Sequence, residues 1–304
     1  MGAEIAAQSA FNSRLHRFTH SPYSASLISF IIGTLFLLGI CLITRQPMHF
    51  SLELVQHNPW WIWLGGFTSA FALTTNVLLF RHLGSVQTSV LPIMGQIIMS
   101  LIIDQFGLFN SQKSELTVIK IIGAVILIGG TIAGTGAFEG VHQQSNKSDE
   151  TGTKLGWQLL GVIAGACLAI QAAVNGYLGQ VLNSALFGTT IAFFISFGVL
   201  AMLCLVIRVP IRTGLARAVH HTSGNWFMWL GGFLGSSYVA ISAQLVPIMG
   251  TGRVIMIALF GQLLFSALID QFSWFRSVHR SVGRMQIIGL VAMLVGIFII
   301  NFVR

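Results

Sequence analysis

Polar side chains recur at helical spacing inside four strongly apolar segments of this sequence. They form two pairs and two rows of three, which are Gln8 with Asn12, Gln171 with Asn175, Gln96 with Ser100 and Asp104, and Gln262 with Ser266 and Asp270. Residues four apart lie on the same face of a helix. Polar groups are costly in hydrocarbon, so they usually face a bundle interior or a water-filled cavity. Amides on such faces are suited to hydrogen-bonding a small polar ligand.

Two interpretations of these faces are open at this point. In the first, the faces converge on a central cavity, and two further polar residues join the lining from neighbouring segments. In the second, the amides and hydroxyls hold helices together through interhelical hydrogen bonds. The first interpretation gives these candidate substrate-binding residues: Gln8, Asn12, Asn76, Gln96, Gln171, Asn175, Tyr238 and Gln262.

The two aspartates of the longer rows lie near the C-terminal ends of their segments. A carboxylate at that position opposes the helix macrodipole, so each aspartate needs a compensating partner. The candidate partners are nearby cations, namely Lys113 or Arg45 for Asp104, and Arg276 or Arg280 for Asp270. The two aspartates could act as gates, one at each face of a membrane, or as interfacial salt bridges that fix helix ends.

The elements that carry these residues are predicted to be membrane-spanning helices. Hydrophobic residues make up 54% of the chain and charged residues 8%, with a mean hydropathy of +0.81, whereas a soluble domain carries about 25% charged residues. Apolar runs of about 20 residues cross ~30 Å of hydrocarbon, where helices satisfy their own backbone hydrogen bonds. The predicted spans are 2–18, 24–43, 59–81, 85–106, 117–138, 157–181, 186–207, 226–248, 252–273 and 284–303.

The chain contains an internal repeat. Residues 58–109 align without a gap on residues 224–275, so that Trp60 matches Trp226 and the Asp-Gln-Phe at Asp104 recurs. Each copy holds five predicted spans, and because five is odd, the second copy must be inverted relative to the first. Inverted repeats around a midplane site are typical of secondary transporters. The predicted fold is an all-α membrane protein with ten transmembrane helices in two inverted five-helix repeats.

The first repeat is predicted to cover residues 1–138 and the second residues 156–304, with a polar linker at 139–155. The first helix is short, because 2–15 matches 165–178 while the second copy extends further upstream. We expect either that this helix spans poorly or that the true start of the protein lies upstream.

Glu4 is the acidic residue within a span that has no acid at the matching place in the other copy, where Cys167 stands instead. If Glu4 is buried, desolvation disfavours its charged form, which would suit a proton-coupling carboxylate. If the helix start is solvated, Glu4 is a favourable charge near a helix N-terminus. Glu4, Asp104 and Asp270 are therefore the candidate gating or coupling residues.

Lysine and arginine are unevenly divided between the two faces of this topology. Five lie on the face that holds both termini, and eleven lie on the other face. The positive-inside rule predicts that the second face is cytoplasmic and that both termini are outside. This bias accounts for the net charge of +8, so no nucleic-acid partner is expected.

Several chemistries lack a signature in the sequence. The three cysteines, Cys41, Cys167 and Cys204, lie inside predicted spans without disulfide or metal spacing. There is no Gly-rich phosphate loop ending in Lys-Ser/Thr and no His-Glu-x-x-His. We predict no enzyme, no cofactor and no metal site. The expected partners are a small-molecule substrate and the lipid bilayer, and a homodimer is left open.

The segment PWWIWLGGF … LGSVQTSVLPIMGQIIMSLIIDQFGLF and its copy NWFMWLGGFLGSSYVAISAQLVPIMG … GQLLFSALIDQFSWF resemble the YdcZ-type branch of the drug/metabolite transporter superfamily. The resemblance covers nearly the whole chain and implies a fused, antiparallel pair of five-span units in a bacterial inner membrane that exports a small organic compound. Related small multidrug exporters couple to protons through a carboxylate in their first helix, where this chain has Gln8, with Glu4 one turn earlier. Other ten-span members keep both termini in the cytoplasm.

Three functions are compatible with this pattern. A secondary transporter would rock its two repeats around a midplane site and export a small metabolite or drug. A passive channel would need a continuous polar path, and the sequence shows no filter-like loop. A non-transporting membrane scaffold would leave the duplicated polar faces unexplained. We favour the transporter; its substrate, its coupling ion and the direction of transport are not encoded in any motif.

Overall fold

The computed structural model describes residues 1–48, 52–135, 151–276 and 282–302. Within these ranges the chain forms α-helices and short 3₁₀ turns, and the described residues form no strand. The helices are α1 (Gly2–Thr19), α2 (Pro22–Ile43), α3 (Leu52–His57), α4 (Leu64–Phe106), α5 (Val118–Gly134), α6 (Thr151–Val181), α7 (Ala185–Val206), α8 (Ile211–His220), α9 (Gly231–Met249), α10 (Thr251–Gln271) and α11 (Arg284–Phe302). Most of the predicted linker falls at 136–150, outside the described residues.

Six described helical segments are long and apolar enough to cross a membrane. Apolar side chains such as Leu35, Ile43 and Phe298 are 63%, 83% and 59% exposed, although water would disfavour that exposure. Outward-facing apolar side chains of this kind are expected where lipid surrounds a helix bundle. The six segments are α2, the Thr88–Phe106 part of α4, the Leu155–Val181 part of α6, α7, the Trp226–Met249 segment that contains α9, and α10, while α5 and α11 are apolar but shorter.

Several helix starts follow from local capping chemistry. Ser21 precedes α2 and accepts a hydrogen bond from the Ser24 N–H at 3.3 Å. Ser184, at the matching place before α7, accepts one from the Phe187 N–H at 3.1 Å. Serine is a preferred N-cap residue because its hydroxyl satisfies a backbone N–H that has no partner inside the helix. The two copies therefore begin their second helices in the same way.

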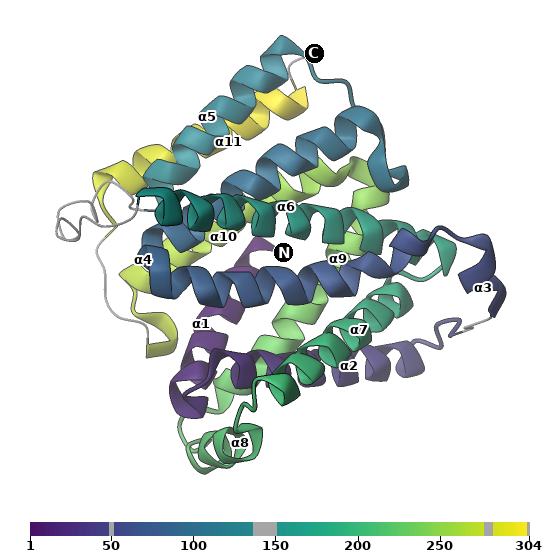
Figure 1. The fold of residues 1–304 in the computed structure, drawn as a ribbon. Coiled ribbons are helices and arrows are strands. Elements are labelled where there is room, and N and C mark those ends of the chain that lie inside the picture. The colour runs from purple at the N-terminus through teal and green to yellow at the C-terminus, as the bar shows by residue number, and fades with distance from the viewer. Residues whose placement is uncertain (49–51, 136–150, 277–281, 303–304) are drawn as a thin grey trace.

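Helix α4 turns back on itself, although its backbone is helical throughout. A Cβ added at Gly161 of α6 would lie 3.0 Å from Leu91 Cβ and 3.2 Å from Leu79 Cδ1. Twelve residues of straight helix span about 18 Å, so one atom could not touch both side chains unless α4 folds back between them. Figure 1 shows the resulting two arms. The predicted separate spans 59–81 and 85–106 are thus joined by a helical bend.

The second copy makes the corresponding turn by breaking the helix. Between α9 and α10, Gly250 has φ 91° and ψ 156°. Glycine reaches this region without a Cβ clash, so the chain can reverse there in a single residue. At this connection the first copy therefore bends within one helix, whereas the second copy ends one helix and begins another.

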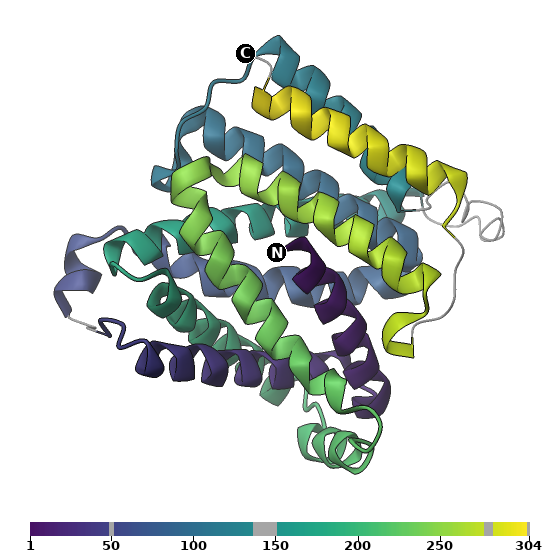
Figure 2. The ribbon, with the colours of Figure 1, turned by 180° about the vertical axis from the view of Figure 1, so that it is seen from behind.

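The helices of the two copies interlock through matching contacts. A Cβ at Gly65 of α4 would overlap the amide of Asn175 on α6, and a Cβ at Gly231 of α9 would overlap the amide of Asn12 on α1. Helix α6 packs along both arms of α4, and α1 packs along α9 and α10 (Figure 2). Small residues at these crossings let the backbones approach closely.

Counterpart helices of the two copies pair side by side in opposite directions. On α5 and α11, Gly123 lies against Gly296, whereas Gly130 lies against Gly289. Residue numbers rise along one helix as they fall along the other, so the pair is antiparallel. Figures 1 and 2 show this pair at one edge of the bundle.

Helices α2 and α7 form the second such pair. The Phe30 and Phe193 rings are 5.2 Å apart, and Cys41 Sγ is 3.6 Å from Thr190 Oγ1. Residue numbers therefore rise along α2 as they fall along α7, so this pair is also antiparallel.

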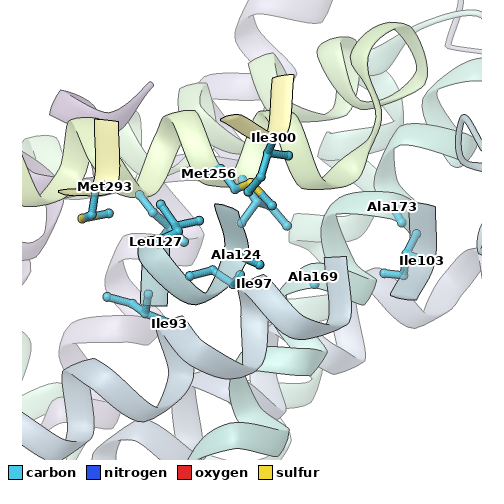
Figure 3. Packing of buried hydrophobic residues seen from close by; sticks show 12 residues of the cluster. Ile93, Ile97, Ile103, Ala124, Leu127, Ala169, Ala173, Met256, Met293 and Ile300 are labelled. Atoms are coloured by element: carbon cyan, nitrogen blue, oxygen red, sulfur yellow. The ribbon is translucent and has the colours of Figure 1, made fainter. Parts of the chain in front are cut away.

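The largest apolar cluster joins the second arm of α4 to α5, α6, α10 and α11 (Figure 3). Ile97, Leu127, Met256 and Met293 are fully buried in it. Burying such a side chain stabilises a fold in water by about 1.5–3 kcal/mol, but in lipid the gain comes from close packing. This cluster anchors the paired α5 and α11 against the helices that line the central cavity.

Candidate functional site

A cavity of about 620 Å³ lies among the described helices. Its walls come from α1, α2, both arms of α4, α6, α7, α9 and α10, with the end of α5 and the start of α11 at its margin. Pockets for small ligands typically measure about 300–1,000 Å³, so this cavity can hold a small organic molecule.

Seven of the eight predicted binding residues line this cavity. They come from several helices, and their amides and phenol converge on the same space. The seven are Gln8, Asn12, Asn76, Gln96, Gln171, Tyr238 and Gln262. The eighth, Asn175, lies outside the lining.

Hydroxyl groups supply much of the remaining lining and were missed in the sequence. Ser26 and Ser29 contribute from α2, Ser69 from the first arm of α4, and Ser242 from α9. Ser29 Oγ donates a hydrogen bond to Asn12 Oδ1 at 2.7 Å, which fixes the amide beside the cavity. A lone serine in an apolar run carries little signal, because such hydroxyls usually bond to their own helix backbone.

The cavity reaches one end of the bundle and stops near its middle. On the second arm of α4 the lining runs from Thr88 to Gln96, and on α10 it runs from Leu259 to Asp270. These two helices lie with their Asp270 and Thr88 ends together at one end of the bundle. We call this the Asp270 end, and the opposite end the Asp104 end. In the described residues, neither 97–106 nor 251–258 contributes to the lining.

Asp104 closes the second end by capping a helix of the other copy. Its Oδ1 accepts a hydrogen bond from the Thr251 N–H at 2.8 Å, and its Oδ2 accepts one from the Gly252 N–H at 2.8 Å. Ser111 Oγ donates to Asp104 Oδ1 at 3.2 Å and lies 2.9 Å from Thr251 Oγ1. The carboxylate is 6% exposed, so the N-terminus of α10 is held without bulk water.

The predicted partners of Asp104 were wrong. Within the described residues Asp104 makes no ion pair with Lys113 or Arg45. Its negative charge faces the positive N-terminal end of α10 instead. That favourable interaction compensates for the unfavourable position of the carboxylate at the C-terminal end of its own helix. The sequence could not show this partner, because the capped helix lies almost 150 residues further along the chain, in the other copy.

The glutamine that follows each aspartate accepts the same kind of backbone hydrogen bond at both ends of the bundle. Gln105 Oε1 accepts a hydrogen bond from the Leu116 N–H, and Gln271 Oε1 accepts one from the Val282 N–H at 2.7 Å. Each amide thereby fixes the start of the segment that leads to the last helix of its copy. This shared hydrogen bond is a structural reason for the glutamine to recur in both copies of the Asp-Gln pair.

Asp270 lies on the cavity lining, at the margin of the open end. It interacts with other groups of the chain. The predicted partner Arg280 lies outside the described residues, and the side chain of Arg276 is also outside them. The structure therefore brings Asp270 to the cavity and leaves Asp104 buried at the other end.

Two further counterpart pairs repeat this difference. Ser266 lines the cavity, whereas Ser100 is 0% exposed and donates to the Ile97 carbonyl at 2.8 Å. Asn12 lines the cavity, whereas Asn175 is 1% exposed. Each residue of the Asp270 end is open, and its counterpart at the Asp104 end is sealed.

Asn175 is also unusual in its hydrogen bonding. Its Oδ1 and Nδ2 are buried and have no hydrogen-bond partner among the described residues. Asn12 has Ser29 as its donor, but the residue that matches Ser29 in the second copy is Ala192. A buried amide without partners destabilises a protein by about 1–3 kcal/mol, so this conformation leaves Asn175 unsatisfied.

Glu4 does not line the cavity. Its Oε2 lies 3.5 Å from the Met1 amino group and makes no hydrogen bond in the part of the chain that is described. Among the described residues there is no cluster of three or more His, Cys, Asp or Glu side chains that could hold a metal ion.

Comparison with known proteins adds three findings. A family model described as "Putative inner membrane exporter, YdcZ" matches residues 1–133 and 156–299, which confirms the resemblance seen in the sequence and its two segments. No curated protein matches the chain. A crystal structure of another protein shares the fold, with a TM-score of 0.64 and 11% identity over 98% of this chain and 96% of that one. This chain is therefore an inner-membrane protein that belongs to the YdcZ exporter family.

Proposed function

We propose that this protein is a secondary exporter that works by alternating access around the central cavity. The cavity lies between two inverted five-helix repeats, residues 1–138 and 156–304. The antiparallel pairing of α5 with α11 and of α2 with α7 supports the inversion, because counterpart helices of inverted repeats run in opposite directions. The matching contacts of Asn12 and Asn175 support a two-fold relation between the copies.

The one-sided cavity is the observation that carries this proposal. Three matched pairs, Asn12 and Asn175, Ser266 and Ser100, and Asp270 and Asp104, each place one member on the cavity lining and bury the other. If the repeats exchange conformations, the members of each pair exchange environments and the cavity opens at the other end. An unsatisfied amide at Asn175 is expected in such a protein, because it gains partners when its end opens.

The distribution of Lys and Arg indicates which side of the membrane the open end faces. In a ten-span topology the Asp270 end is the face with eleven of the sixteen Lys and Arg residues, which the positive-inside rule makes cytoplasmic. The structure then corresponds to the inward-open state, in which an exporter loads its substrate. The seven predicted binding residues on the lining bind the substrate, and Asp104 acts as the gate of the outer end.

The remaining acids have secondary roles in this mechanism. Asp270 becomes the gate of the inner end when the repeats exchange, and Glu4 is the candidate for proton coupling. A passive channel is disfavoured, because the Asp104 cap and the sealed residues around it interrupt any continuous path. A scaffold would not need a cavity lined by amides from so many helices.

A metabolite screen followed by a transport assay tests the proposal. Purified protein is screened for compounds that raise its melting temperature, and each hit is tested for counterflow in proteoliposomes, where exchange saturates for a carrier. Gln96→Leu and Gln262→Leu should lose both the thermal shift and the exchange while keeping their own melting temperatures. Gln180→Leu, the same change at an exposed position outside the lining, should keep both. Hits that bind without any exchange would contradict the proposal.

A further inference from the structure

The polar lining of the cavity is almost free of charge. Among the side chains that the structure describes, seven carboxamides and ten hydroxyls line it, and no Lys, Arg or His does. Asp270 is the only carboxylic acid among the described lining residues; it lies at the margin and interacts with other groups of the chain. Glu4 lies behind the lining near Tyr238 and is paired with the Met1 amino group, so among the described residues a charged substrate in the deep part of the cavity would meet no unpaired opposite charge.

The absence of a counter-charge favours some substrates over others. A buried charge without a partner loses its hydration and gains no ion pair in return, which weakens binding strongly. An anion would further lack the Arg or Lys donors that usually bind carboxylate and phosphate groups. A hydrophobic cation would leave the amides unpaired on every side, and each unpaired amide opposes binding.

The lining groups share one hydrogen-bonding property. A carboxamide has both a donor and an acceptor, and so does a hydroxyl. A ligand hydroxyl also donates and accepts, so it pairs with either kind of group. At the deep end Gln96, Gln171 and Gln262 approach from three different helices, and Ser242 joins them from a fourth. Such a lining matches a ligand that carries hydroxyls around its whole circumference.

Apolar side chains complete the walls between these groups. Phe30 and Phe193 pack against each other at 5.2 Å on one side, and Tyr238 lies on the lining with its phenol. Aromatic rings on a lining can pack against the C–H surfaces of a ring-shaped molecule. A lining with polar groups spread between flat apolar faces is suited to a ligand that has both features.

We propose that the substrate is an uncharged, hydroxyl-rich molecule of sugar or polyol type, bound by the Gln96, Gln171 and Gln262 amides. This inference rests on the proposed transport function, and it names the substrate class for the same cavity. Amine-bearing and carboxylate-bearing forms of the same scaffold are excluded because the deep cavity offers them no counter-charge.

The test compares probes that share a scaffold and differ in charge. Glucose, glucosamine and glucuronate form one set, and galactose, galactosamine and galacturonate form a second; mannitol, myo-inositol and sucrose extend the neutral class. Each probe is measured by the change in melting temperature of the full-length protein and by counterflow in proteoliposomes. At least one neutral probe should bind and exchange, with its amine and acid forms weaker by about 100-fold.

Variants locate the binding within the cavity. Gln96→Leu and Gln262→Leu should each weaken binding of the neutral probe about tenfold or more, because each removes a bifunctional partner of the ligand hydroxyls. Gln180→Leu should bind as the unaltered protein does, since it lies outside the lining. A neutral probe that binds equally well to all three variants would place its site elsewhere and overturn the assignment.

The outcomes separate the substrate class from the transport function. If an amine or an acid exchanges and no neutral probe does, the inferred class is wrong and the carrier proposal stands. If no neutral probe binds at all, the class is also wrong. If compounds bind but none exchanges in proteoliposomes, the transport proposal itself fails.

Discussion

The Asp104 and Asp270 ends of the bundle carry the same short motif in two different environments. At both ends the glutamine accepts a hydrogen bond from a backbone N–H of the following segment. The aspartates differ, since Asp104 is buried against the N-terminus of α10, whereas Asp270 lies on the cavity lining. The glutamine therefore has the same environment in both copies, whereas the aspartate has a different environment at each end.

The asparagine pair shows how imperfect matching biases such a bundle. Asn12 has a donor in Ser29, but the matching Ala192 gives Asn175 none. The Asn12 amide therefore has a hydrogen-bond donor, whereas its counterpart Asn175 has no partner among the described residues. A few kcal/mol separates the two states of a typical conformational switch, so a difference of one hydrogen bond is large enough to shift their populations.

The largest expected effect comes from locking the Asp104 end with a disulfide. Ser111 Oγ and Thr251 Oγ1 are 2.9 Å apart, so paired cysteines at these positions are close enough to form a bond. Oxidised Ser111→Cys/Thr251→Cys should lose counterflow of any transported hit by about 100-fold, because the outer end can no longer open. A reducing agent should restore it.

Each single cysteine variant is the control for this lock. Ser111→Cys alone and Thr251→Cys alone should keep transport within about threefold under oxidising conditions, since neither can form the bond. Undiminished counterflow in the fully cross-linked protein would show that the Asp104 end does not open during transport.

The second effect is a loss of stability on removing the cap. Asp104→Ala leaves the buried N–H groups of Thr251 and Gly252 without an acceptor, and should lower the free energy of unfolding by about 2–4 kcal/mol. Asp104→Asn keeps one carbonyl acceptor and should lose about half as much. Asp270→Ala should lose less than Asp104→Ala, because Asp270 lies on a cavity that water can enter. Melting curves in detergent measure this ranking of stability. Equal losses of stability in Asp104→Ala and Asp270→Ala would contradict the difference between the two ends.

The smallest effect separates the two asparagines. Asn12→Ala removes the hydrogen bond from Ser29 and should destabilise the protein by about 1 kcal/mol. Asn175→Ala removes a buried amide that has no partner, so it should leave the free energy of unfolding unchanged or raise it by up to about 1–3 kcal/mol. Chemical unfolding of both variants, compared with the unaltered protein, measures the difference. The opposite order would mean that Asn175 is well satisfied.

Much of the architecture could be predicted from the sequence because it depends on composition and period. Apolar runs of membrane length gave α2, α6, α7, α9 and α10 within a few residues at most ends. The step of four between polar residues identified five of the seven predicted binding residues that line the cavity, and Asn76 and Tyr238 were predicted from neighbouring segments. These features are local, so a single sequence contains them.

The remaining features depend on contacts between distant segments. The helical bend within α4 and the break at Gly250 occupy matching places, and no local signal separates them in advance. The partner of Asp104 is a helix N-terminus in the other copy, which only the packed bundle brings near. Differences between the copies, such as Ser29 against Ala192, lie in the sequence, but their effect on the Asn12 and Asn175 amides appears only in the packed bundle.

The accessibility of one matched pair tests the account most directly. In a background without Cys41, Cys167 and Cys204, Ser266→Cys and Ser100→Cys are labelled with a membrane-impermeant maleimide in vesicles of both orientations. We predict that Ser266→Cys reacts from the cytoplasmic side, and that Ser100→Cys is unreactive at rest but reacts from the outer side when a transported compound is supplied. Labelling of both positions from the same side, or a Ser100→Cys that stays protected during transport, would contradict alternating access between the two ends.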